Sequence, residues 1–255
     1  MQMGLFDLPA PVFGAIDGML AMALPALLRL AVWAILAGWI TMWVYGRFSN
    51  QEKIRTLKTR QKQQQNAIAG FDGEFSQLMP LIRDALALGF RQLGLSLGPA
   101  LLATVPVVFI IVWVSGEYGY ELPPAGSEIL VVAEPAGGEI SWSPAPDARR
   151  HENGWLVKWP AQGQSLTISE AGRALLTLPP DHAVAVIHKK RWWNLLMANP
   201  LGYLPQDGHT DSVHLALPEV VLIGAGPVWI RGWMFSFFGI FLLSSIAFRQ
   251  LLRLD

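Results

Sequence analysis

The chain of 255 residues contains no cysteine, which excludes disulfides, thiolate metal sites and cysteine nucleophiles. Charge is also scarce: 15% of the residues are charged, against about a quarter in an ordinary soluble domain. Basic and acidic residues number 19 each, so no net field attracts nucleic acid, and we expect no specific nucleic-acid partner. Hydrophobic residues make up 52%, and the composition therefore favours a membrane protein.

Motifs for catalysis or metal binding are missing as well. The five histidines occur between His151 and His214, and none lies in an HExxH or other metal-ligand spacing. Residues 94–98 read GLSLG and match the letters of GxSxG, but they lie inside an apolar run and not at a strand-to-helix turn, so Ser96 is no nucleophile elbow. The sequence GAG at Gly224 to Gly226 precedes Pro227 instead of following a strand. We therefore expect no enzyme, no catalytic residue, no metal and no cofactor.

Three apolar runs are long enough to cross a bilayer, which takes about 20 helical residues. The first, from Leu20 to Tyr45, contains a single charge, Arg29. This arginine lies either in a water-filled groove or near the outer interface, where it snorkels beside an amino-terminal interfacial helix. The second run, Leu93 to Val114, contains two prolines and is expected to be kinked. The third, Trp229 to Phe248, has aromatic and basic anchors at its ends.

Loop charges predict the orientation of these spans. Residues 47–92 carry eight basic and four acidic residues, whereas residues 115–227 carry seven basic and twelve acidic residues. The positive-inside rule then places residues 47–92 in the cytoplasm. The sequence predicts a multi-pass protein of a bacterial inner membrane, with its amino terminus outside and its carboxyl terminus inside.

The segment between the first two spans has a helical pattern. Phe48 to Ala69 is rich in Gln, Lys and Arg, with Ser49 or Asn50 as the N-cap, and Glu74 to Gly89 resumes the pattern after a glycine-containing turn. The pattern predicts a helical hairpin, in which the second helix packs on the first or covers the spans. The alternative is a solvated basic helix near anionic lipid.

The segment between the second and third spans is typical of β structure. Short β-prone runs (EILVVAE, GEISW, GWLVKW, QSLTIS, ALLTL, HAVAVI, SVHLAL, EVVLI) alternate with Pro, Gly and Asp turns, which indicates a small β-sandwich or barrel-like domain. Trp192 and Trp193 follow three bases, so this segment is either an interfacial anchor, like Trp229 and Trp233, or a helix that caps the domain with tryptophan in its core.

The expected fold class is therefore an α-helical integral membrane protein with three transmembrane helices, a helical hairpin and an extracytoplasmic β-rich domain. The expected divisions are an outer helix or arm at 1–19, spans at 20–46, 93–115 and 228–248, the hairpin at 47–92, the β-rich domain at 116–227 and a tail at 249–255.

One junction carries a resemblance to a known family. Leu93-Gly94-Leu95-Ser96-Leu97-Gly98-Pro99-Ala100-Leu101-Leu102, followed by Val105-Pro106-Val107-Val108-Phe109, is similar to the stretch where the hairpin enters the next span in the YidC/Oxa/Alb insertases. The order of spans also resembles this superfamily, and most of all its short three-span members. Bacterial members have five core spans and an arginine in the first core helix where this chain has Gly38, Trp39 and Thr41.

The resemblance implies a membrane-protein insertase or insertion chaperone, whose hydrated groove eases the passage of client segments without a cofactor. The groove would be lined by Thr41, Ser96, Thr104, Pro106, Ser244 and Ser245. The hairpin would capture a client or a ribosome through Arg55, Lys58, Arg60 and Lys62. Membrane lipids and client proteins are the implied partners.

A second interpretation comes from another class of protein. The chain is then a structural or assembly subunit of a membrane complex, which binds a partner through its β-rich domain. A concavity lined by Thr41 and Thr104 favours the insertase, and tight packing of the spans favours the assembly subunit.

Overall fold

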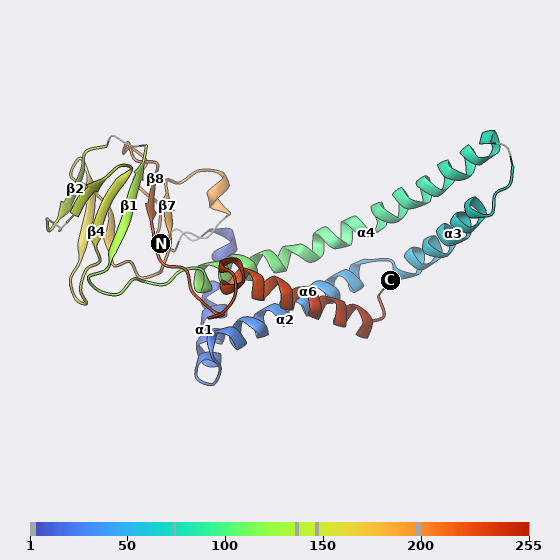
Figure 1. Ribbon diagram of the computed structural model, residues 1–255, viewed down its shortest axis with the longest axis horizontal. Helices are drawn as coiled ribbons and strands as arrows, with labels where there is room; N and C mark the ends of the chain where they lie inside the picture. The colour runs from blue at the N-terminus through green and yellow to red at the C-terminus, as the bar shows by residue number, and fades with distance from the viewer. Residues whose placement is uncertain (1–3, 74, 136–137, 146–147, 197–199, 255) are drawn as a thin grey trace. The chain divides into compact units, whose positions relative to one another are not determined.

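The computed structural model describes residues 4–73, 75–135, 138–145, 148–196 and 200–254 (Figure 1). The chain forms two compact units, and each is described by itself. The first contains residues 1–30 and 109–236, and the second contains residues 31–108 and 237–255.

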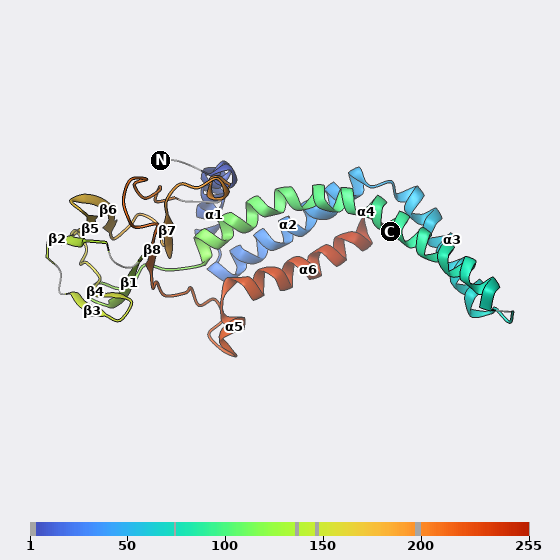
Figure 2. The same cartoon turned by 90° about the horizontal axis from the view of Figure 1, so that it is seen from above.

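Three helices are long and apolar enough to cross a membrane: α2 (Ala26–Phe48), most of α4 (Phe75–Tyr118) and α6 (Trp233–Leu251). In the second unit, α2 and α6 approach closely at Gly38 (Figure 2). A Cβ at this position would lie 3.1 Å from Oγ of Ser245 and closer still to Oγ of Ser244. Glycine is therefore needed at this helix crossing.

The helix boundaries differ from the expected spans where proline intervenes. The run that begins at Leu20 is divided, because α1 (Ala10–Ala21) ends before Pro25 and α2 begins after it. A short helix, α5 (Val228–Arg231), precedes α6, so the third long helix begins at Trp233. The 3-10 helix η1 (Leu5–Asp7) precedes α1.

The helical hairpin consists of α3 (Gln51–Ala69) and the first part of α4 (Figure 1). Asn50 is the N-cap of α3, since its side-chain oxygen accepts a hydrogen bond from the amide of Lys53 at 3.0 Å. The side-chain amide of Gln64 donates to the carbonyl of Leu81 at 3.3 Å and joins the two helices. Pro80, Pro99 and Pro106 lie inside α4, which nevertheless runs through 44 residues without a break. Glu74, the expected first residue of the second helix, lies outside the described residues.

The β-rich domain belongs to the first unit and contains two antiparallel sheets. One has the strand order β3-β4-β1-β8-β7 and the other β2-β5-β6. The strands are β1 (Glu128–Glu134), β2 (Ile140–Ser143), β3 (Ala148–His151), β4 (Gly154–Lys158), β5 (Leu166–Glu170), β6 (Arg173–Leu178), β7 (Val186–His188) and β8 (Ser212–Leu215). Buried residues from both sheets, among them Val131, Val157, Ile168 and Val213, form one hydrophobic core.

One strand prediction for this domain is wrong, and one strand was missed. The run EVVLI, from Glu219 to Ile223, contains no strand of either sheet; its main-chain amides at Leu222 and Ile223 instead reach the carbonyl of Arg231 at 2.8 and 3.2 Å. Strand β3, with the sequence ARRH, was not expected from the sequence because it has almost no β-prone residue. Strand β3 forms because the turn between His151 and Gly154 places it antiparallel to β4.

Candidate functional site

An exposed apolar stripe runs along α4 from the hairpin into the apolar part of the helix. Its large residues have between 52% and 72% of their surface exposed: Met79, Leu86, Phe90, Leu93, Leu97 and Leu101. At 100° per residue they fall within an arc of about 80°, so they share one face of the helix. An uncovered apolar surface of this extent marks a binding surface when it lies outside lipid.

The opposite side of the hairpin portion of α4 is half-buried, at Leu81, Ile82, Ala85 and Leu88. The helix therefore has two apolar faces, of which only one is covered. Sequence reasoning predicted the helical pattern but did not separate its two faces, and it missed Met79 and Phe90. The spacing of 7, 4, 3, 4 and 4 residues along the stripe was the signal that could have found them.

A cleft of about 740 Å³ lies beside this stripe, between α3 and α4. Three basic residues line it, Lys53 and Arg60 from α3 and Arg91 from α4, against a single acid, Glu52. Within the described part of the chain, no ion pair involves any of these three basic side chains. Leu57, Gly94 and Leu95 contribute an apolar wall. The arrangement suits a ligand with a negative headgroup and an apolar body.

The four basic residues expected to capture clients all lie on α3. Arg55, Arg60 and Lys62 are exposed and Lys58 is half-buried. Arg60 is the one of the four that lines the cleft. Their role in capture stays a prediction.

The hydroxyl groups expected to line a groove are mostly bonded to their own helices. Thr41 donates to the carbonyl of Ala37 at 2.8 Å, Thr104 to that of Leu101 at 2.7 Å, and Ser244 to that of Phe241 at 3.0 Å. Thr104 is exposed, whereas Ser245 is buried, and its hydroxyl has no hydrogen-bond partner among the described residues.

Ser244 and Ser245 come together with Gly38 of α2, where the helices are packed tightly. Ser96 and Pro106 are half-buried in α4. A groove lined by these residues stays a prediction.

Arg29 has a partner that sequence reasoning did not identify. In the first unit its guanidinium forms an ion pair with Asp17 of α1, whose side chain is 4% exposed. The hydroxyl of Tyr118 donates to the other carboxylate oxygen at 2.6 Å, and the guanidinium carbon lies 5.6 Å from the centre of the Tyr118 ring. Arg29 is thus neutralised by a buried counter-ion from the amino-terminal helix α1, while its position relative to the membrane interface stays a prediction.

The four expected anchor tryptophans differ in exposure. Trp192 is 82% exposed and Trp229 67% exposed, while Trp193 is 39% exposed with its ring edge-on to His188. Trp233 is half-buried. Among its described residues, the segment after the three bases has the 3-10 turn η2 (Trp193–Leu195) as its helical part, and neither tryptophan is buried, which does not fit a capping helix with these tryptophans in the core. Residues 197–199 of this segment lie outside the described residues.

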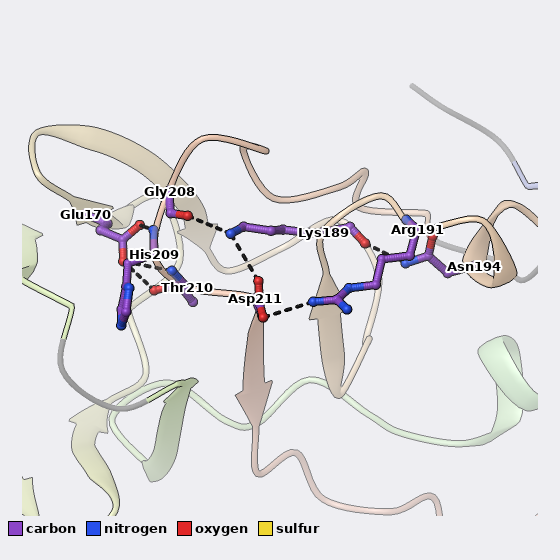
Figure 3. Close-up of polar contacts among 8 residues, drawn as sticks. All are labelled: Glu170, Lys189, Arg191, Asn194, Gly208, His209, Thr210 and Asp211. Carbon is purple, nitrogen blue, oxygen red and sulfur yellow. Dashed lines mark hydrogen bonds and ion pairs between the residues drawn. The ribbon is translucent and has the colours of Figure 1, made fainter.

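Polar contacts hold this tryptophan segment to the β-rich domain (Figure 3). Lys189 donates to the carbonyl of Gly208 at 2.6 Å and pairs with Asp211 at 3.1 Å, and Arg191 pairs with the same carboxylate at 2.9 Å. The side-chain amide of Asn194 donates to the carbonyl of Lys189 at 2.6 Å. These bonds fix the base-rich strand end from which Trp192 projects.

Glu170 is a buried carboxylate of the β-rich domain (Figure 3). It accepts hydrogen bonds from the amide of His209 at 2.8 Å, and from the amide and hydroxyl of Thr210 at 3.0 and 2.6 Å. Burial alone would raise the pKa of Glu170, but these three donors outweigh burial and lower it. The carboxylate therefore stays ionised and serves as a structural acceptor.

Comparisons with known proteins found no protein-family model, no curated protein and no solved structure that matches this chain.

Proposed function

We propose that this protein is a membrane-protein insertase or insertion chaperone. The single observation that carries the proposal is the exposed stripe on α4, because it extends from the hairpin portion of the helix, at Met79, to Leu101 in the apolar portion. A hydrophobic client segment could remain in contact with this stripe as it moves from water into lipid. The unbroken helix supports the proposal, since it matches the resemblance to the YidC/Oxa/Alb insertases at the hairpin-to-span junction.

In this proposal the hairpin lies in the cytoplasm of a bacterial cell, on the side of the inner membrane where client segments are made. The basic residues of α3 contact the client or the ribosome, and the stripe contacts the apolar part of the client. The exposed hydroxyl of Thr104 offers a weak polar contact further along α4. The driving force is physical and not chemical, because each apolar contact lowers the free energy of a client segment outside lipid.

A second function is favoured by a different observation. Gly38 packs tightly against Ser244 and Ser245, which leaves no space between α2 and α6 at that level. Tight packing of the spans favours an assembly subunit, because such a protein needs no groove for client segments. In that function the stripe on α4 would be covered permanently by one partner protein.

The test replaces Leu86 and Phe90 together by serine in the full chain. Insertion of a reporter membrane protein is measured in cells depleted of their own insertase, alongside photocrosslinking from position 79 to the client. Complete burial of a Leu or Phe side chain is worth about 1.5–3 kcal/mol, so client crosslinking should fall at least about tenfold. Leu251→Ser is the matched control, because Leu251 is 73% exposed at the end of α6.

Phe90→Leu keeps the apolar surface and should retain insertion. Unchanged insertion and crosslinking in the double variant, at wild-type abundance, would overturn the proposal. Loss of one stoichiometric partner from the purified protein, with no client crosslinked in the wild type, would establish the assembly subunit instead.

A further inference from the structure

We propose that the cleft between α3 and α4 binds the phosphate headgroup of an anionic phospholipid. The inference goes beyond the function proposed above and does not depend on it, because a lipid site would serve an insertase and an assembly subunit equally. It rests on the charge of the cleft, its level along α4 and its open apolar wall.

The charge of the cleft is the first argument. Lys53, Arg60 and Arg91 oppose Glu52, so its lining carries a net charge of about +2, which complements the charge of an anionic lipid. The residues come from two helices and converge on one space. Lys53 and Arg60 are seven residues apart, two turns along one side of α3, and Arg91 faces them from α4.

The level of the cleft along α4 is the second argument. The helix ends at Tyr118, and about 20 residues are enough to cross the hydrocarbon core. Counting back from Glu117 places the other boundary of the core near Leu97. Gly94 then lies about one helical turn outside the hydrocarbon and Arg91 nearly two turns outside it, in the headgroup region. Lys53 likewise lies about one turn beyond the end of α2 at Phe48.

The apolar wall is the third argument. Gly94 faces open space, since a Cβ built at this position meets no atom within 4 Å. Leu57 and Leu95 line the same space, and the exposed residues Leu97 and Leu101 continue along α4 towards the lipid. A phosphate between the three bases would leave its acyl chains against these leucines. A free anion would gain nothing from this apolar surface.

The experiment titrates the purified full chain in detergent with dioleoyl phosphatidylglycerol and counts bound lipids by native mass spectrometry. One lipid should bind saturably, and dioleoyl phosphatidylcholine, which has the same phosphate but no net charge, should bind more weakly. Arg91→Gln removes one cleft charge and should weaken binding about fivefold. Gly94→Leu fills the cleft without changing any charge and should weaken binding at least as much.

Arg83→Gln is the matched control, since it removes the same charge from α4 at an exposed position outside the cleft. It should leave binding of the first lipid unchanged. If Arg83→Gln and Arg91→Gln weaken lipid binding equally, the lipid is attracted by the overall basic charge and not by the cleft, and the proposal is overturned. Wild-type binding by both cleft variants would also overturn it, as would displacement of the lipid by millimolar inorganic phosphate, which would identify a free anion as the ligand. Circular dichroism verifies that each variant is folded.

Discussion

The ion pair between Asp17 and Arg29 gives the most direct test of the structure. Asp17→Asn keeps the shape of the side chain but removes the charge that neutralises Arg29. The Asp17 side chain is 4% exposed and that of Arg29 19% exposed, so the arginine would be left largely buried without a counter-ion. Breaking a buried pair in this way costs about 3–5 kcal/mol. We expect a loss near 3 kcal/mol, because the partial exposure of Arg29 lets it reach some water.

Tyr118 contributes to the stability of the same ion pair. Its hydroxyl donates to the same carboxylate, and a hydrogen bond to a charged group contributes about 1.5–3 kcal/mol. Tyr118→Phe should therefore cost about 1.5 kcal/mol while the ring remains beside the guanidinium of Arg29. Arg29→Gln combined with Asp17→Asn should cost clearly less than the sum of the two single changes, because no unpaired charge is then buried.

The measurement is equilibrium unfolding of the full chain in mixed detergent micelles, followed by circular dichroism. Asp84→Asn is the control, since Asp84 is exposed on α4 and its replacement should change the free energy of unfolding by less than about 0.5 kcal/mol. If Asp17→Asn is as stable as the wild type, or if the two single losses simply add, the buried pair does not hold α1 to α2 as the structure indicates.

Two further perturbations test other parts of the structure. Gly38→Ala should destabilise the second unit by about 1–3 kcal/mol, because the new Cβ meets Ser244 and Ser245. Adding Ser244→Ala to the same chain should restore part of the lost stability. If Gly38→Ala leaves the thermal melting temperature unchanged, α2 and α6 are not tightly packed. Because its pKa is lowered on folding, Glu170 should stabilise the β-rich domain fully above its ordinary pKa of 4.5 and lose this contribution as the pH falls through the lowered value. Glu170→Gln should cost about 1–3 kcal/mol at pH 7 and flatten that acid dependence in fluorescence-monitored unfolding. Glu152 is exposed in the same domain, so Glu152→Gln is the control and should change neither the stability nor its acid dependence.

Local patterns in the sequence predicted the main elements. Runs of apolar residues longer than the hydrocarbon core identify α2, α4 and α6, because a bilayer demands such lengths. Asn50 was recognisable as an N-cap, and the alternation of apolar residues marks β1, β5 and β8. The break between α1 and α2 was not predicted, although Pro25 was its signal, since proline has no amide proton to continue a helix.

The candidate site was only partly predictable. The basic residues of α3 were visible in the sequence, but their convergence with Arg91 depends on how α3 folds back along α4. The stripe on α4 was visible as a period, although only the structure distinguishes the covered face from the exposed one.

By itself, the sequence determined which segments are apolar enough to leave water and where the main chain must turn, because composition, periodicity and proline act within a few residues. The tertiary structure alone decided which side chains meet across long separations. Asp17 and Tyr118 are 101 residues apart, and Glu170 and Thr210 are 40 apart, yet each pair shares a hydrogen bond. No local pattern encodes such a bond, because it forms only where burial leaves a polar atom with no other partner.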